Sequence, residues 1–481
     1  MALAPTPTRP TGLDPTSRRR TAVVLATLGT TLAGVAAWGL AADVAWLSQA
    51  FYAWAWWAWI LLLDAFCVWR RGSSLLTTRR HLLGLLATSS VTFWFLFELL
   101  NLRFANWYYV GTIELAGPLT YLGAGLFVAA AFATVFVGMF EVFDALGAAG
   151  VLTKRGAPRA LPPWLPGGLQ LLGLAMALAA VLSPFYLAPL IWGSLTFLLD
   201  PWNYRRGNRS LLRDVEAGDG RAVWRLFLAG LISGLVWEGL NFAAPQKWIY
   251  TVRGLEDLKL FEMPLLGFLG FPALAFDAVT AFSLLSFALC GNVGWEHEDD
   301  LAAPAAPRPH PRTGLALGRY WRTLPVQVVL WVGITALLMP RSIGSVRLRL
   351  EHLPEVAAEG PAASEALRAA GVHWPRQLLA ALEGDEADAL ADGLGWDVAR
   401  RERVARQAEL WLFKGIGSWF GPLLEGVGVD TVQDLASWDP IDLHAVLAAE
   451  AAARGVKAPR EDWVRVWVLA SRSRGVLLRA G

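Results

Sequence analysis

The sequence predicts an all-α protein, with a polytopic membrane bundle of about nine spans, a parallel internal repeat of four spans, and a soluble all-α C-terminal domain. The 481 residues are 55% hydrophobic and 17% charged, and apolar runs near the roughly 20 residues that cross a bilayer recur as far as residue 340. After that the composition shifts to Ala, Glu, Arg and Leu at helical spacing. Four short motifs also occur twice in one order, which indicates an internal duplication.

The expected spans cover residues 21–42, 50–69, 81–101, 118–141, 166–183, 185–202, 222–243, 263–290 and 321–340. They divide the chain into a cytoplasmic N-terminal tail (1–20), a first membrane repeat (21–160), a second (161–300), a linker (301–320), a last span (321–340) and the soluble domain (342–481). The two cysteines, Cys67 and Cys290, lie in apolar runs, so neither a disulfide nor a cysteine metal site is expected.

The basic residues of the connecting segments gather on one side of the expected membrane. Arg70–Arg71 and Arg205–Arg206 fall on the same side as Arg18–Arg20, and few basic residues lie on the other side. Because cytoplasmic loops are enriched in Lys and Arg, the N-terminus is expected in the cytoplasm, with the protein in a bacterial-type inner membrane. Nine spans then place the C-terminal domain outside.

The duplicated motifs mark corresponding positions. The first copy carries Asp64, Arg70–Arg71, Glu98 with Asn101, Trp107 with Tyr109, and Pro118, and the second carries Asp200, Arg205–Arg206, Glu238 with Asn241, Trp248 with Tyr250, and Pro264. Each copy holds an even number of spans, so the copies should share one orientation and be related by an axis along the membrane normal. A repeat of this kind usually places the working site between the copies.

The candidate catalytic residues are the acids Glu98, Glu238 and Asp277. A charged carboxylate in hydrocarbon costs about 3 kcal/mol even on lenient insertion scales, so each must be protonated, partnered or facing a polar cavity. Glu98 and Glu238, facing each other across the pseudo-axis, would suit general acid chemistry or proton-coupled binding. Alternatively, each glutamate only bonds the Trp-containing loop that follows and fixes the fold.

Asp277 stands near the middle of the eighth span, which contains no Lys or Arg, and the fourth span has no acid at the matching place. Either it takes part in the site, or it accepts hydrogen bonds from Thr280 or a neighbouring helix. We expect the three acids to line one polar cavity nearer the outer face. The expected substrate-binding wall is Asn101, Asn241, Trp107, Tyr109, Trp248 and Tyr250.

In both copies an apolar helix ending in an acid is followed by a Trp-x-Tyr element, a short loop and a Pro-led helix rich in Phe. Over about residues 50–290 this pattern resembles the small membrane-integral lycopene cyclase domains, which also occur in tandem. That family carries Pro-Leu-Glu-Glu where this chain has Pro118-Leu-Thr-Tyr and Pro264-Leu-Leu-Gly, with Glu262 before the second proline. The resemblance implies a shared helical fold and acid chemistry on an isoprenoid.

The C-terminal region contains Lys414-Gly-Ile-Gly417 and, after it, Leu424-Glu-Gly-Val-Gly-Val429, which together resemble a helix-hairpin-helix unit. Leu367–Val372 repeats the second element and suggests a degraded copy upstream. Many such hairpins bind DNA phosphates through glycine amides. The local acidic run Glu425, Asp430, Asp434, Asp439 and Asp442 argues against nucleic acid and favours a protein partner or a structural role.

Three classes of function remain open. The first is an enzyme acting on an apolar lipid or isoprenoid through intramembrane carboxylates, and the second is a transporter or channel for a small molecule or ion. The third is a membrane-anchored scaffold that presents the helical domain. The expected partners are membrane lipid, an apolar small-molecule ligand and a protein bound by the C-terminal domain. The residues do not identify a cofactor, and no metal site is expected.

Overall fold

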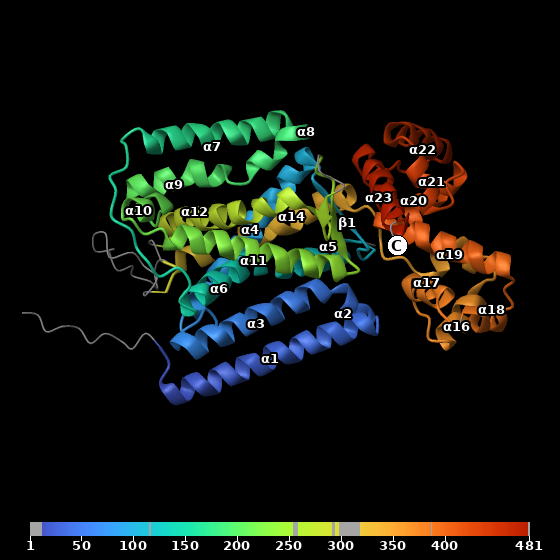
Figure 1. Ribbon diagram of the computed structural model, residues 1–481, viewed down its shortest axis with the longest axis horizontal. Helices are drawn as coiled ribbons and strands as arrows, with labels where there is room; N and C mark the ends of the chain where they lie inside the picture. Colours follow the sequence, from blue (N-terminus) through green and yellow to red (C-terminus); the bar gives the residue numbers. More distant parts are fainter. Residues whose placement is uncertain are drawn as a thin grey trace, which may run out of the picture. The chain divides into compact units, whose positions relative to one another are not determined.

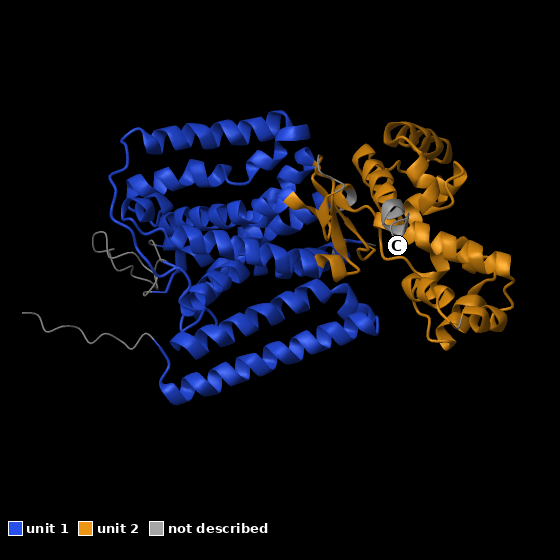
Figure 2. Ribbon diagram, in the orientation of Figure 1, with its two compact units in different colours: residues 1–104, 117–240, 266–338 blue, residues 105–116, 241–265, 339–481 orange. Residues whose placement is uncertain are grey.

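The computed structural model describes residues 12–114, 117–253, 258–290, 294–297, 318–385 and 387–479. The described chain is mostly helical, with four short strands, and divides into two compact units (Figures 1 and 2). Unit 1 comprises residues 1–104, 117–240 and 266–338, and unit 2 comprises residues 105–116, 241–265 and 339–481. Most of the predicted linker 301–320 lies outside the described residues.

Unit 1 contains the long apolar helices. In chain order its elements are α1 (Pro15–Ala41), α2 (Ala45–Gln49), α3 (Phe51–Arg71), α4 (Arg80–Phe104), α5 (Pro118–Phe132), α6 (Thr134–Ala148), α7 (Leu165–Leu182), α8 (Pro184–Leu187), η1 (Ala188–Ile191), α9 (Ser194–Arg206), α10 (Leu211–Glu216), α11 (Arg221–Ala243), η2 (Leu265–Leu269), α12 (Gly270–Cys290) and α14 (Leu324–Ser342). Helix α1 packs on α3 as α7 packs on α9, and α3 packs on α6 as α9 packs on α12 (Figure 1).

Seven helices of the described chain are long and apolar enough to cross a membrane. Six of them are α1, α3, α4, α7, α11 and the stretch Leu265–Cys290, and the seventh is Leu119–Ala148, which joins α5 to α6. The predicted sixth span, 185–202, is instead broken: α8 and η1 end before Gly193, and α9 has only 13 residues. The predicted last span contains the shorter apolar helix Leu324–Leu338.

Local sequence explains where the helices depart from the predicted spans. Pro184, Pro189 and Gly193, with Gly193 at φ +87°, interrupt the sixth span. The eighth was predicted from residue 263, but strand β4 and η2 come first and α12 begins at Gly270. The fourth bends between α5 and α6, where the Ser90 hydroxyl donates to Phe132 O at 2.6 Å and accepts from Phe136 N at 3.1 Å. A side chain inserted into a helical ladder is a common cause of a kink.

Unit 2 contains more than the predicted soluble domain, because both loops that carry the Trp-x-Tyr elements belong to it. Its strands are β1 (Trp107–Val110), β2 (Lys247–Tyr250), β3 (Lys259–Leu260) and β4 (Met263–Pro264). Its other elements are η4 (Leu350–His352), α15 (Pro354–Ala357), α16 (Pro361–Ala369), α17 (Pro375–Glu383), α18 (Ala387–Gly393), α19 (Val398–Leu412), η5 (Phe413–Gly415), α20 (Gly417–Gly426), α21 (Val432–Ser437), α22 (Pro440–Arg454) and α23 (Glu461–Arg479).

Four helices of unit 2 end in the same way. The residue after a left-handed glycine donates to the carbonyl five residues earlier in the pairs Val372 to Leu367 (2.8 Å), Trp396 to Ala391 (2.9 Å), Val429 to Leu424 (2.9 Å) and Val456 to Ala451 (3.0 Å). This is the Schellman cap, and the apolar residue after the glycine is buried in three of the four cases, whereas Val456 is exposed. The sequence similarity between 367–372 and 424–429 therefore corresponds to one local structure.

Candidate functional site

Asp277 caps a helix inside unit 1. Its carboxylate accepts from Gly193 N at 2.8 Å, from Thr196 N at 2.7 Å and from the Thr196 hydroxyl at 2.6 Å. These donors stand at the N-terminus of α9, which the break at Gly193 leaves without intrahelical acceptors. Asp277 is fully buried, and its oxygens are occupied by protein donors. These contacts fit the alternative predicted from the sequence, bonding to a neighbouring helix, and a catalytic role for Asp277 stays a prediction.

Asp64 and Asp200, the acids before the two Arg-Arg-Gly motifs, make matching contacts. Asp64 accepts from the Ser74 hydroxyl at 2.7 Å and from Leu76 N at 3.0 Å. Asp200 accepts from the Ser210 hydroxyl at 2.9 Å and from Leu212 N at 2.8 Å, ten and twelve residues on in each case, and also from Leu211 N at 2.8 Å. Each carboxylate organises the turn that leads into the next helix.

The Trp-x-Tyr elements pair with each other. Strand β1 is antiparallel to β2 with Trp107 opposite Tyr250, Tyr108 opposite Ile249 and Tyr109 opposite Trp248. Because Trp107 corresponds to Trp248 and Tyr109 to Tyr250, the register maps onto itself when the copies are exchanged. The predicted repeat thus coincides with the local two-fold symmetry of an antiparallel strand pair, centred on Tyr108 and Ile249.

Asn241 holds the second Trp-x-Tyr element in place. Its side-chain amide donates to Trp248 O at 3.0 Å and its side-chain oxygen accepts from Trp248 N at 3.0 Å. With both ends of the amide bound to one residue of β2, Asn241 fixes the strand. This contact fits the structural alternative for the Glu-x-x-Asn motif better than a substrate-binding role.

Glu98 and Glu238 are both buried, at 2% and 0% exposure. Aromatic rings around them form two reciprocal contacts between the copies of unit 1. Trp56 lies 5.7 Å from Trp237, the residue before Glu238, and Trp192 stacks at 4.6 Å on Phe97, the residue before Glu98. Trp56 corresponds to Trp192 when Asp64 is aligned with Asp200, so these pairs are again related by exchange of the copies. A catalytic role for Glu98 and Glu238 stays a prediction.

The Lys414–Gly417 segment, predicted as part of a helix-hairpin-helix-like unit, packs inside unit 2. A Cβ on Gly415 would collide with the Val110 side chain of β1, and one on Gly417 would stand 2.7 Å from Ser345 Cβ. Lys414 Nζ lies 2.6 Å and Lys247 Nζ 3.4 Å from the buried Glu262 carboxylate. Although burial alone would raise it, these two ammonium groups hold the pKa of Glu262 below its ordinary value.

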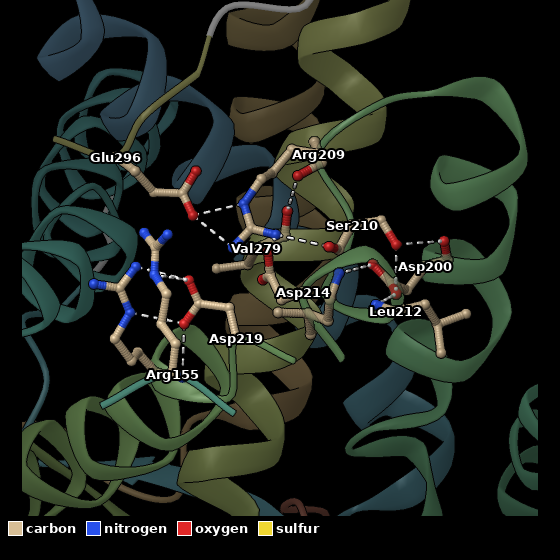
Figure 3. Close-up of polar contacts among 12 residues, drawn as sticks. Arg155, Asp200, Arg209, Ser210, Leu212, Asp214, Asp219, Val279 and Glu296 are labelled. Carbon is tan, nitrogen blue, oxygen red and sulfur yellow. Dashed lines mark hydrogen bonds and ion pairs between the residues drawn. The ribbon is translucent and has the colours of Figure 1, made fainter. Parts of the chain in front are cut away.

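A buried polar cluster that the sequence analysis did not predict lies in unit 1 (Figure 3). Arg209 Nη1 lies 2.6 Å from Asp214 Oδ2, and Arg209 Nη2 lies 2.5 Å from Glu296 Oε1. Nearby, Asp219 is held by Arg221 at 2.7 Å and by Arg155 at 3.3 Å. Arginines in loops with many basic residues were interpreted as topology signals, and only tertiary structure shows that Arg209 is 9% exposed.

The first copy contributes to the same cluster. Arg79 pairs with Asp144 and donates to Trp295 O at 2.8 Å. Glu141, one turn before Asp144 on α6, is fully buried and accepts from Leu75 N at 3.3 Å. The predicted fourth span ended at residue 141, so these two acids were placed at its edge and not recognised as site residues. Within the described chain, no group of three or more His, Cys, Asp or Glu residues could hold a metal ion.

The comparisons with known proteins concern the C-terminal domain alone. Residues 358–474 match a family described as a domain of unknown function (DUF4332), which covers most of the helices of unit 2. No curated protein and no solved structure matches the chain. The matched segment holds 18 Asp and Glu against 13 Lys and Arg, so its charge does not favour nucleic acid.

Proposed function

We propose that this protein is a membrane-anchored scaffold whose duplicated helical unit presents the DUF4332-matching domain outside the cytoplasm. The observation that carries the proposal is the composition of unit 2, which combines the C-terminal domain with one loop from each copy. The backbone passes between the units after residues 104, 116, 240, 265 and 338. The chain therefore crosses between the anchor and the presented domain five times.

The anchoring contacts run through the strand pair. The Tyr108 hydroxyl donates to Lys414 O at 2.8 Å, and the Tyr108 ring stacks on Trp463 at 4.9 Å. Tyr108 and Ile249 belong to the same buried core as the C-terminal helices. The loops between the third and fourth and the seventh and eighth spans are on the side with few basic residues, which supports an extracytoplasmic position for the whole of unit 2.

The use of the acids also favours a scaffold. Asp64, Asp200 and Asp277 accept hydrogen bonds from backbone or hydroxyl donors that start or turn helices. Carboxylates committed in this way stabilise the fold and are poor general acids, since a reacting carboxyl must exchange its proton with a substrate. These three acids in unit 1 therefore favour a structural role over a catalytic one.

The runner-up is acid chemistry on an apolar lipid or isoprenoid, as the resemblance to lycopene cyclase domains implies. The observation in its favour is the pair Glu98 and Glu238, buried at corresponding positions among aromatic rings. In a transporter, Glu98 and Glu238 would instead carry protons. Both alternatives need at least one of these carboxyl groups to ionise or to donate a proton.

Complementation separates the proposals. Cells lacking the gene would receive the full chain, the double variant Glu98→Gln/Glu238→Gln, or chains with Ile441→Glu or Trp419→Glu, two exposed positions of the presented domain. The scaffold account predicts that the double variant restores the phenotype and that at least one surface variant does not, at equal membrane abundance. Full activity of both surface variants together with failure of the double variant would favour the enzyme or the transporter.

A further inference from the structure

A short segment after α12 bridges the two copies within unit 1. Residues Trp295 and Glu296 are 1% and 8% exposed. The Trp295 ring stacks on Phe140 at 4.2 Å and meets Phe143 edge-on at 4.9 Å, both on α6 of the first copy. Arg79, also of the first copy, donates to the carbonyl of Trp295. We call the segment Gly294–His297 the latch.

The second copy holds the latch through one ionic contact. Glu296 Oε1 accepts from Arg209 Nε at 2.5 Å, and the same guanidinium reaches Asp214 at 2.6 Å (Figure 3). The Arg209, Asp214 and Glu296 side chains are 8%, 9% and 1% exposed. Breaking this contact would remove the ion pair between the latch and Arg209 and leave the contacts of Trp295 with the first copy in place.

The charges of this contact do not balance. One buried guanidinium faces two buried carboxyl groups, and Glu296 Oε2 has no hydrogen-bond partner among the described residues. Asp219 adds a further carboxylate, itself neutralised by Arg155 and Arg221. An excess negative charge away from water is costly, and the least expensive way to remove it is to bind a proton.

We propose that Asp214 is a proton-binding site whose occupancy sets how tightly the latch joins the two copies. A proton from the surrounding water forms an O–H bond with an Asp214 carboxylate oxygen, and no other bond changes. Of the two carboxyl groups that form ion pairs with Arg209 among the described residues, only Glu296 is then charged, and the pair is balanced. Loss of the proton makes two carboxylates compete for one guanidinium and weakens the hold on Glu296.

The electrostatic surroundings support this assignment. Burial raises the pKa of Asp214 from 3.8 to about 7, and Glu296 and Asp219 act in the same direction while Arg209 opposes them. When the latch opens and Asp214 meets water, its pKa returns toward the ordinary value. The closed latch therefore binds the proton more tightly, and acidification from about pH 7 toward about pH 4 favours closure. Above about pH 7 neither state holds the proton and the dependence ends.

Hydrogen exchange of the full chain in lipid nanodiscs, measured between pH 5 and 8 and corrected for intrinsic rates, tests the proposal. A peptide containing Trp295–His297 should lose protection by up to about tenfold per pH unit as the pH rises to about 7, and then level off. In Asp214→Asn this dependence should vanish. Glu296→Gln should also remove it, because Arg209 then neutralises Asp214 alone, and this variant serves if Asp214→Asn does not fold.

Asp219→Asn is the matched control, because Asp219 belongs to the same cluster but is paired with two arginines that hold its pKa below the ordinary value against the effect of burial. The pH dependence should persist in this variant, but end at a slightly lower pH, because Asp219 contributes to the raised pKa of Asp214. The proposal is overturned if the wild-type peptide shows no change between pH 5 and 7, if Asp214→Asn or Glu296→Gln retains the change, or if Asp219→Asn abolishes it.

Discussion

The two copies of the membrane unit differ most where the first has one continuous helix, α3, and the second has the broken run α8, η1 and α9. The copies also differ in one intramembrane acid. Aligning Pro118 with Pro264 places Ala131 opposite Asp277, and only the copy with the break carries the acid. A helix start inside a membrane exposes backbone N–H groups that need an acceptor. Asp277 on α12 therefore accepts hydrogen bonds from the backbone N–H groups that the break at Gly193 leaves free at the start of α9.

The comparison also shows which features the copies share. The turn contacts of Asp64 and Asp200, the self-complementary strand register and the reciprocal aromatic pairs all relate one copy to the other. Thr134 and Thr280 add a further match, since each hydroxyl donates to the carbonyl three residues before it, at 2.6 and 3.1 Å. These correspondences fit the predicted duplication at the Asp and Trp-x-Tyr landmarks, whereas Pro118 begins a helix and Pro264 lies in β4. Each correspondence can be broken separately.

The largest effect is expected at Gly230. A Cβ there would stand 2.5 Å from Phe271 O and 2.6 Å from Pro272 Cα, both backbone atoms of α12. Gly230→Val should therefore prevent α11 from packing and abolish recovery of monodisperse protein in detergent. Ser90, the corresponding residue of the first copy, bridges Phe132 and Phe136, and Ser90→Ala should be recovered with a loss of about 1–2 kcal/mol in unfolding free energy. Normal yield of Gly230→Val would contradict the close packing.

Asp277→Ala comes next. Removing the acceptor of one buried and two part-buried donors should lower the free energy of unfolding by about 3 kcal/mol. Ala131→Asp should also destabilise, because α3 is continuous in that copy and offers no free helix start. Thermal unfolding in matched detergent would measure both. A stable Asp277→Ala variant that had lost the cellular phenotype would show that the residue serves a reaction and not the break.

Asp200→Asn should cost more than Asp64→Asn. Asp200 accepts from two backbone amides and a hydroxyl, whereas Asp64 accepts from one amide and a hydroxyl. We expect losses of about 1–3 kcal/mol, with Asp200 the larger, in denaturant unfolding of the two variants side by side. The reverse order would mean that the matching contacts are unequal in strength.

The smallest effect is expected at Asn241. Asn241→Ala frees the backbone of Trp248 and should raise hydrogen exchange in β1 and β2 while leaving the exchange of α22 unchanged, for a cost of about 1 kcal/mol. Unchanged exchange in Lys247–Tyr250 would show that the strand pairing alone fixes this loop.

The sequence was sufficient for features with a periodic or repeated signal. Apolar runs predicted the helical membrane part, the basic motifs marked corresponding turns, and the shift in composition near residue 342 marked the start of the C-terminal helices. It failed where partners are distant along the chain. Arg209 meets Glu296 across 87 residues, and Val110 meets Gly415 across about three hundred, so neither the buried cluster nor the membership of the loops in unit 2 has a local signature. Pro189 and Gly193 could have revealed the broken span, because both interrupt helices.

The central claim is that the C-terminal domain and the Trp-x-Tyr loops occupy the same, outer side of the membrane. Cys67 and Cys290 are 1% and 0% exposed, so we expect little thiol labelling of the chain without an added cysteine. A membrane-impermeant maleimide applied to intact cells should label Ile441→Cys and Leu258→Cys, at 67% and 55% exposure, and should reach Arg159→Cys, between the two copies, only after permeabilisation. Labelling of Leu258→Cys without Ile441→Cys would contradict the account, because the loop and the domain would then lie on opposite sides.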